Sequence, residues 1–168
     1  MTLSLATFAG QLSTILEAEN NPVGREKAAA LVRDALADRP FVESLFDAAS
    51  PERKVVYEHP ALGFCILAHR YTGPKDSPPH DHGPSWAIYG QADGETAMTD
   101  WALVAPASAS QPGKVRKVRD YKLTPGLAHV YNEGDLHAPS RAGPTRLIRL
   151  EGTNMDRVTR LKYEPLQE

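Results

Sequence analysis

Apolar positions in the first third of the chain recur at helical spacing. The stripe formed by residues 8–16 fits one face of a helix. Asn21 followed by Pro22 is typical of a capping residue and the first position of a second helix. Asp38 begins a third, shorter helix. We therefore expect residues 1–50 to form helices that pack on the rest of the chain, and no pattern among them indicates catalysis.

From Pro51 onward, apolar and polar residues alternate with the two-residue period of β-strands. The predicted strands cover residues 54–58, 64–71, 86–89, 95–104, 115–123, 127–131, 136–139 and 145–150. The strand that begins at Trp86 is expected to stop at Gly90, and residues 153–168 are expected to form a polar tail. We predict a mainly β fold, in which residues 51–168 form a small barrel and the helices belong to the same structural domain.

Two histidines lie two residues apart after a proline-rich turn. Because side chains at i and i+2 of an extended segment point to the same face, His80 and His82 would converge while Asp81 points away. A third histidine, His137, comes directly after the turn-forming residues 132–135. Convergent imidazoles are common ligands of transition metals. The spacing therefore predicts a metal site formed by three histidines.

These histidines and several glycines resemble the two sequence motifs of the cupins, small barrels of the double-stranded β-helix type. The matching positions are Gly73, which stands one residue early, and His80, His82, Gly94, Gly126, Gly134 and His137. Asn132 and Arg141 replace a proline and an asparagine of the second motif. The metal-binding glutamate of the family would fall at Trp86 or Ala87, so three histidines remain without a carboxylate. The resemblance implies a cupin barrel.

A three-histidine set is similar to that of the thiol dioxygenases, which include cysteine dioxygenase, and of some cupin dioxygenases that cleave diketones. Residues 80–86, His-Asp-His-Gly-x-Ser-Trp, look especially like bacterial members of the cysteine dioxygenase-like group, whose barrels also follow a set of helices. The resemblance implies Fe(II) as the cofactor, with dioxygen and a small anionic substrate, such as a thiol acid, as partners. Two family features are missing: a crosslinked cysteine near Ala87 and a Ser-x-His-x-Tyr set at residues 151–155. Cysteine itself is therefore not the indicated substrate.

The resemblance also implies an arginine, near the start of the barrel, that holds the carboxylate of the substrate. Arg53 falls within a residue of that place, and a guanidinium can grip a carboxylate through two parallel hydrogen bonds. An exposed position in a turn is the structural alternative for Arg53. Arg70, Arg146 and Arg149 are rival candidates, and strand alternation puts Arg146 and Arg149 on opposite faces.

Aromatic residues near the motifs are candidates for the wall of a substrate pocket. Trp86, Tyr89 and Tyr131 would give an apolar pocket with one or two hydroxyl groups, although each would also serve as a core residue. His129 shares strand parity with Tyr131. We expect His129 and Asp81 to support the metal ligands from behind, as hydrogen-bonding partners.

Other candidate ligands have weaker support. Glu95 would supply a carboxylate only if the register of the barrel strands differed from the expected one. His59 and His69 have no partner in either motif, and we expect both to be structural. A site with three histidines also suits zinc, nickel or manganese. The alternatives to a dioxygenase are therefore a non-redox cupin enzyme, such as an isomerase or lyase, and a sensor or small-molecule-binding cupin that holds zinc or nickel.

Charge and composition exclude further classes. The 168 residues carry a formal net charge of −2, which argues against a nucleic-acid partner. No apolar run approaches the length of a membrane span, and the first residues do not resemble a signal peptide, so we expect no membrane partner. The single cysteine, Cys65, allows no internal disulfide, which fits a cytoplasmic protein. We expect a monomer or a homodimer.

Overall fold

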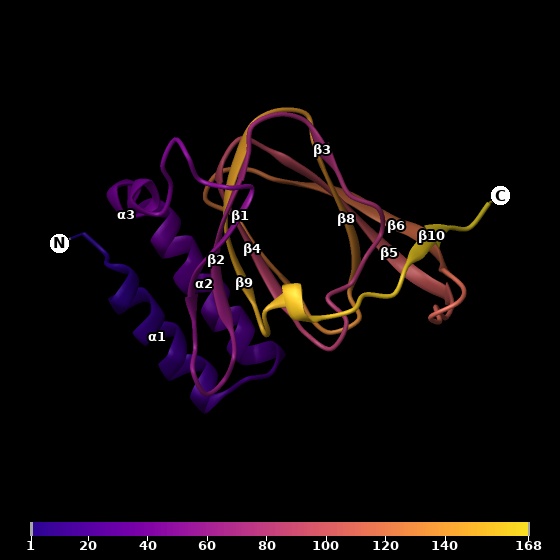
Figure 1. The fold of residues 1–168 in the computed structure, drawn as a ribbon, viewed down its shortest axis with the longest axis horizontal. Helices are drawn as coiled ribbons and strands as arrows, with labels where there is room; N and C mark the ends of the chain where they lie inside the picture. The colour runs from indigo at the N-terminus through magenta and orange to yellow at the C-terminus, as the bar shows by residue number, and fades with distance from the viewer. Residues whose placement is uncertain (1, 168) are drawn as a thin grey trace.

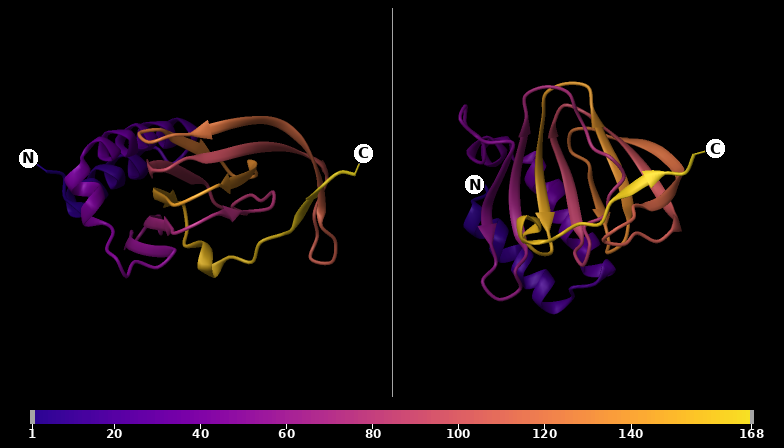
Figure 2. Two further views of the ribbon diagram at one scale, coloured as in Figure 1. Left: turned by 90° about the horizontal axis from the view of Figure 1, so that it is seen from above. Right: turned by 45° about the vertical axis from the view of Figure 1, so that its right-hand side comes forward.

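Two curled β-sheets face each other and form a barrel, with helices outside one of them (Figures 1 and 2). The computed structural model describes residues 2–167. The helices are α1 (Leu5–Ala18), α2 (Pro22–Ala37), α3 (Arg39–Ser44) and the short 3₁₀ helix η1 (Met155–Arg157). The strands are β1 (Arg53–Glu58), β2 (Cys65–Tyr71), β3 (Lys75–Asp76), β4 (Ala87–Asp93), β5 (Thr96–Ala105), β6 (Gly113–Leu123), β7 (Ala128–Tyr131), β8 (Leu136–Arg141), β9 (Thr145–Glu151) and β10 (Tyr163–Pro165). The fold is the mainly β, double-stranded β-helix barrel with N-terminal helices that the sequence predicts.

The order of the strands explains which loops meet. The first sheet has the order β1-β2-β9-β4-β7, and the second has the order β10-β6-β5-β8-β3. Neighbouring strands are antiparallel except for β10 and β6. The chain crosses from the second sheet to the first between β3 and β4, between β6 and β7, and between β8 and β9. The crossing before β4 runs beside the start of β8, and these are the two segments that carry the predicted ligand histidines.

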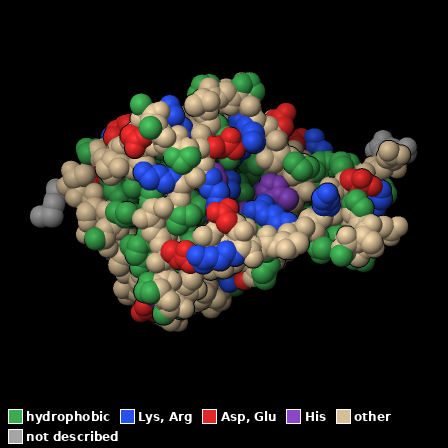
Figure 3. All heavy atoms as spheres, viewed as in Figure 1, with side chains coloured by type: hydrophobic (Ala, Val, Ile, Leu, Met, Phe, Trp, Pro, Cys, Tyr) green, Lys and Arg blue, Asp and Glu red, His purple; other side chains and the backbone are tan. Residues whose placement is uncertain are grey.

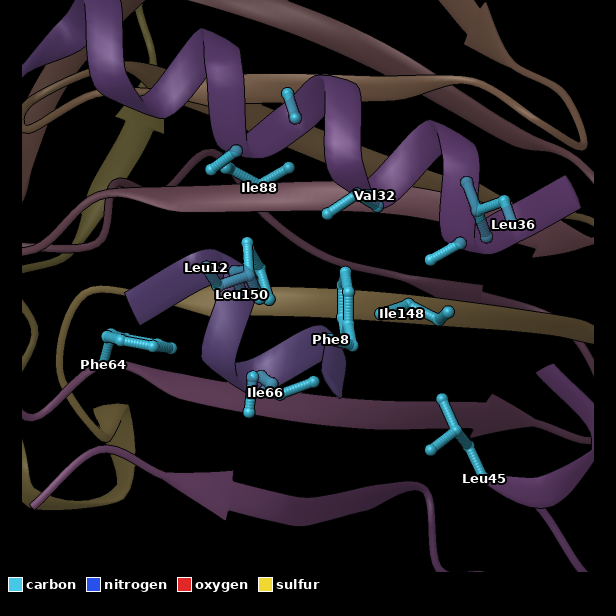
Figure 4. Close-up of a cluster of buried hydrophobic side chains, with 14 of the residues drawn as sticks. Phe8, Leu12, Val32, Leu36, Leu45, Phe64, Ile66, Ile88, Ile148 and Leu150 are labelled. Carbon is cyan, nitrogen blue, oxygen red and sulfur yellow. The ribbon is translucent and has the colours of Figure 1, made fainter. Parts of the chain in front are cut away.

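The helices α1, α2 and α3 cover the outer face of the first sheet. Alternate residues of its central strands, including Ile88 on β4 and Ile148 on β9, point outward and pack against apolar side chains of α1 and α2 (Figure 4). The second helix begins where the sequence predicts, because the side chain of Asn21 accepts hydrogen bonds from the backbone N–H groups of Val23 and Gly24. This apolar layer fixes the first sheet from outside.

The opposite face of the same strands lines the barrel interior. Tyr89 on β4 and Leu147 on β9 join a second buried cluster that includes Tyr131. Strand β4 continues through Gly90, beyond its predicted end. A Cβ atom at Gly90 would lie 2.5 Å from Cγ1 of Val32 in α2, so the glycine permits a close approach of helix and strand rather than a turn.

The C-terminal residues are more ordered than a polar tail. They contain η1 and the short strand β10, which pairs in parallel with the start of β6. Strand β3 has only two residues and was also not predicted. Within residues 2–167, no helix combines the length and the apolarity needed to cross a membrane.

Candidate metal centre

The three predicted ligand histidines lie together where the loop before β4 meets the start of β8. The backbone N–H of His80 donates to the carbonyl of His137 at 3.0 Å, and the reverse hydrogen bond measures 2.9 Å. The candidate ligand nitrogens of His80, His82 and His137 all lie within 4.8 Å of one another. This group, drawn from residues 2–167, contains no carboxylate. Residues 77–86 form a loop, in which the pairing of His80 with His137 is the one β-bridge. The imidazoles are therefore positioned by this pairing with β8, because the loop is not a continuous strand.

Backbone carbonyls set the orientation of two of the imidazoles. Nδ1 of His80 lies 2.8 Å from the carbonyl oxygen of Pro78, and Nδ1 of His137 lies 2.9 Å from that of Asp135. A carbonyl oxygen only accepts hydrogen bonds, so Nδ1 must carry the proton in each neutral ring. The lone pair is then on Nε2, where it can bind a metal.

The surroundings keep these rings neutral. Burial lowers the pKa of His80 to about 4. Burial also lowers the pKa of His82 and of His137 well below the usual value for histidine, and the neighbouring imidazole adds to the effect in both cases. Neutral imidazole is the form that binds a metal. In charge, all three side chains therefore fit a divalent transition metal, and the tautomers of His80 and His137 fit one as well.

The phenol of Tyr89 lies against two of the three imidazoles. Its oxygen is 3.0 Å from Nε2 of His82 and 3.1 Å from Nε2 of His137. Burial raises the pKa of Tyr89, so the phenol keeps its proton at neutral pH. The ring of Tyr131 stacks on His137, with 4.0 Å between ring centroids. These two tyrosines, both sequence candidates, thus lie next to the histidine cluster.

A hydrogen-bonded chain runs outward from Tyr131. Tyr121 donates to a carboxylate oxygen of Asp100 at 3.0 Å, so Tyr131 must be the donor in its 2.7 Å hydrogen bond to Tyr121. The ring of His129 packs against both tyrosines. Its buried Nδ1 has no hydrogen-bond partner among residues 2–167. His129 thus contributes to the aromatic wall and forms no hydrogen bond to a ligand histidine.

The side chain of Asp81 has its partners outside the histidine cluster. One carboxylate oxygen accepts from the backbone N–H of Gly83 at 3.0 Å, and the other accepts from the hydroxyl of Tyr163 at 3.2 Å. The first bond stabilises the turn between the ligand loop and β4, and the second joins this loop to the C-terminal segment.

A cavity of about 600 Å³ opens beside His80. Its walls include Tyr71, Arg141, Arg149 and residues 160–164 of the C-terminal segment. Figure 3 shows histidine side chains beside Lys and Arg side chains in a hollow of this face of the molecule. The cavity gives a small molecule a route to the histidine cluster, past a wall that is rich in positive charge.

The two arginines in this wall are buried and stacked on tyrosines. Cζ of Arg149, on β9, lies 4.0 Å from the ring centroid of Tyr89, and Cζ of Arg141, on β8, lies 4.3 Å from that of Tyr71. Arg141 was not a candidate from sequence. It stands four residues after His137 on the same strand, so strand parity places both side chains on one face. This parity would have allowed Arg141 to be predicted from the sequence.

None of the four predicted substrate-binding residues is among those that line the cavity, and two of them, Arg53 and Trp86, also lie away from the histidine cluster. The guanidinium of Arg53 donates to both carboxylate oxygens of Glu151, at 2.8 and 3.0 Å, and is therefore already paired within the protein. Trp86 packs among the side chains that face the helices, and the guanidinium of Arg25 in α2 lies over its ring. Trp86 has the opposite parity to Tyr89, which explains why the two side chains point to opposite faces of the sheet. The prediction that Arg53, Trp86, Tyr89 and Tyr131 form the wall of the pocket is corrected accordingly, although Tyr89 and Tyr131 do contact the histidine cluster.

The remaining candidates also lie away from the cluster. Glu95 forms an ion pair with Lys122 at the surface. Arg70 donates to backbone carbonyls, and Arg146 pairs with Glu43 and Asp93. The other two histidines have local partners: Nδ1 of His59 accepts from two N–H groups of the following turn, and Nδ1 of His69 lies 3.1 Å from the hydroxyl of Tyr71.

No protein-family model matches the chain, and no curated protein sequence matches it. Solved structures give likenesses of the fold. A cupin-2 domain containing protein from Shewanella frigidimarina is 15% identical, with 64% of this chain and 85% of that chain covered and a TM-score of 0.44. KdgF from a Halomonas species is 17% identical, with 67% and 91% covered and a TM-score of 0.46.

A third likeness is to a conserved protein with a double-stranded β-helix domain from Klebsiella pneumoniae. It is 12% identical, with 73% of this chain and 88% of that chain covered and a TM-score of 0.48. At these identities and TM-scores, none of the three proteins indicates what this chain does. The chemistry is therefore inferred from the histidine cluster and the cavity.

Proposed function

We propose that the chain is a non-haem Fe(II) dioxygenase with three histidine ligands, acting on a small anionic substrate such as a thiol acid. The observation that carries the proposal is the convergence of three neutral imidazoles, without a carboxylate, beside a cavity lined by buried arginines. Neutral ligands leave the charge of a divalent ion uncompensated. An anionic group of the substrate is therefore strongly favoured at the open positions of such a site.

His80, His82 and His137 would hold the ion, and ferrous iron would supply the reactivity toward dioxygen. For a thiol acid, both oxygen atoms of one dioxygen molecule are added to the sulfur and the thiol becomes a sulfinic acid. The oxidation of the sulfur balances the reduction of dioxygen, so no further reductant is required.

The other residues of the site bind and orient. Arg149 takes the place of Arg53 as the partner of an anionic group, because it lines the cavity beside His80. Tyr89 holds a proton next to two ligand nitrogens, where it can donate to a bound anionic group. Tyr131 restricts the rotation of the His137 ring by stacking on it. Buried side chains around the cluster limit the access of water.

The proposal is tested by oxygen uptake. Protein purified without air is loaded with one equivalent of ferrous iron and mixed with 3-mercaptopropionate, cysteine, other small thiols and a β-diketone. We expect uptake with a thiol acid, formation of its sulfinate in the same molar amount, and loss of both in His80→Ala. His59→Ala is the matched control, because His59 lies outside the cluster.

The metal content of the protein as isolated is measured alongside. If none of these compounds causes oxygen uptake and the isolated protein contains zinc or nickel, the dioxygenase proposal is rejected. This result would favour a non-redox enzyme or a binding protein, both of which could use the same three histidines.

A further inference from the structure

The cavity contains more positive charge than the neighbouring carboxylates neutralise. Arg141 is 1% exposed, and its Nε and Nη2 have no hydrogen-bond partner among residues 2–167. Arg149 is 7% exposed. Its one ion pair with a described residue is to Glu151, at 3.8 Å, and Glu151 already accepts two hydrogen bonds from Arg53. Two buried guanidiniums are thus left with little compensation.

The tyrosines leave the N–H edges of these guanidiniums available. Tyr71 covers a face of Arg141 and Tyr89 covers a face of Arg149. A stacked guanidinium still presents its N–H groups in its own plane, where they match the two oxygens of a carboxylate. Both arginines line the cavity that includes His80. An anion in the cavity can therefore reach these donors and His80 of the histidine cluster together.

Burying a guanidinium is costly unless an anion accompanies it. Burial lowers the pKa of Arg141, yet arginine remains protonated in proteins. The imbalance extends to the rim, where Arg160 and Lys162 form no ion pair with a residue of the described chain, whereas Lys75 is paired with Glu52. An excess of two positive charges deep in the cavity calls for two negative charges on the ligand.

The size of the cavity agrees with a substrate larger than a three-carbon acid. Pockets for drug-sized ligands measure roughly 300–1,000 Å³, and this one measures about 600 Å³. The geometry points to a thiol dicarboxylate as the substrate, with one carboxylate held by Arg141, the other by Arg149, and the thiol directed to the histidine cluster. This inference rests on the proposed function for the reacting group. The anion sites themselves require no metal.

Binding to the metal-free protein tests the two anion sites. Calorimetric titration compares succinate with butyrate, which has the same carbon chain and one carboxylate fewer. We expect succinate to bind at least about tenfold more tightly, because a buried, hydrogen-bonded charge pair contributes well over the free energy of a tenfold change. Arg141→Gln and Arg149→Gln should each remove most of this preference. Arg70→Gln is the control, since Arg70 lies outside the cavity.

The result that would overturn the inference is equal affinity for succinate and butyrate in the unmodified protein, a comparison that does not depend on any variant folding. A preference for succinate that survives both Gln variants would also overturn it.

An activity comparison separates this inference from the proposed function. With iron-loaded protein, kcat/KM for oxygen uptake should be at least about tenfold higher with mercaptosuccinate than with 3-mercaptopropionate, since the two thiols differ by one carboxylate. Equal values would contradict the inference and leave the dioxygenase standing. A preference for succinate in the titration without oxygen uptake from any thiol would reject the dioxygenase and leave the dicarboxylate site standing.

Discussion

Single backbone carbonyl groups set the orientation and the tautomer of two imidazoles in the histidine cluster. Because Pro78 and Asp135 accept from Nδ1 of His80 and His137, these rings cannot present Nδ1 to the interior without losing a hydrogen bond. The carbonyls belong to residues two positions before each histidine, so the same short segments supply both the ligand and its orientation. Two of the three imidazoles are therefore oriented by the backbone before any ion binds.

His137→Ala removes one of the three ligands, and we expect it to abolish stoichiometric binding of a divalent metal. Two neutral imidazoles do not suffice for tight binding. Elemental analysis after dialysis measures the occupancy, and far-UV circular dichroism checks that the helices remain. His69→Ala is the control, because His69 is also buried but lies outside the cluster. This variant should keep the metal. Full occupancy in His137→Ala would show that the third ligand is wrongly assigned.

The thiol of Cys65 should be unreactive in the folded protein. It is fully buried, and burial raises its pKa to about 11 from the usual 9.0, with the charges of Glu58 and Glu151 acting in the same direction. Below pH 9 the folded protein holds the thiol proton, so this contribution to stability is complete there and is lost as the pH rises through about 11. We expect negligible alkylation by iodoacetamide at pH 8, measured by mass spectrometry, and full alkylation in urea. Rapid alkylation of the native protein would contradict this assignment.

Strand parity explains which site residues the sequence could and could not reveal. The two-residue spacing indicated His80 and His82, although both lie in a loop and not on a strand, and the addition of His137 follows from a turn beside a strand. Arg141 was within reach of the same rule. The same rule could not show that Arg53 is paired within the protein. Its partner Glu151 is distant in sequence, and their contact depends on the alignment of β1, β2 and β9.

At the scale of elements, the contact between α2 and β4 depends on the absence of a side chain at Gly90. Gly90→Ala would place a Cβ atom 2.5 Å from Val32 and 3.3 Å from Leu36. We expect this overpacking to lower the free energy of unfolding by about 1–3 kcal/mol, measured by urea denaturation.

Gly10→Ala is the matched control in α1, where an added Cβ has no neighbour within 4 Å. It should raise the stability by about 0.5–1 kcal/mol, because alanine favours the helix. Equal stability of Gly90→Ala and the unmodified protein would mean that helix and strand separate easily.

Long, periodic elements were predictable from the sequence, whereas short ones were not. The cap at Asn21 and the alternation in β9 are local signals, and both elements begin within a residue of the expected place. Strands β3 and β10 have two and three residues and owe their conformation to their partners β8 and β6. Glycine at position 90 resembles a strand end when read locally. The structure requires glycine there because helix α2, which lies far away in the sequence, packs closely against the strand.

At the scale of the whole molecule, a partly buried ion pair connects the helical layer to the candidate metal centre. Arg25 in α2 donates to both carboxylate oxygens of Glu133, at 2.6 and 2.7 Å, and to the side chain of Asn132. Both acceptors lie in the turn that precedes His137. The layer thus supports the loop that delivers a ligand, in addition to covering the first sheet.

This connection predicts that the helices and the barrel unfold together. Far-UV circular dichroism follows mainly the helices, while the fluorescence of Trp86 and Trp101 follows the helix-facing core and the second sheet. We expect the two signals to share one urea transition. Arg25→Met should shift both signals equally and lower the stability by about 1–3 kcal/mol. The lower half of that range applies if solvent at Glu133, whose side chain is 44% exposed, screens the pair.

Lys27→Met is the control, because the ion pair of Lys27 with Glu19 is at the surface, and it should change the stability by less than about 0.5 kcal/mol. Two separate transitions in the unmodified protein would mean that the helices form an independent unit. A single transition whose midpoint is unchanged in Arg25→Met would mean that apolar packing alone couples the helices to the barrel. A single transition that moves with Arg25→Met would make the ion pair part of what holds the ligand turn, and bound metal should then raise the common midpoint for both signals.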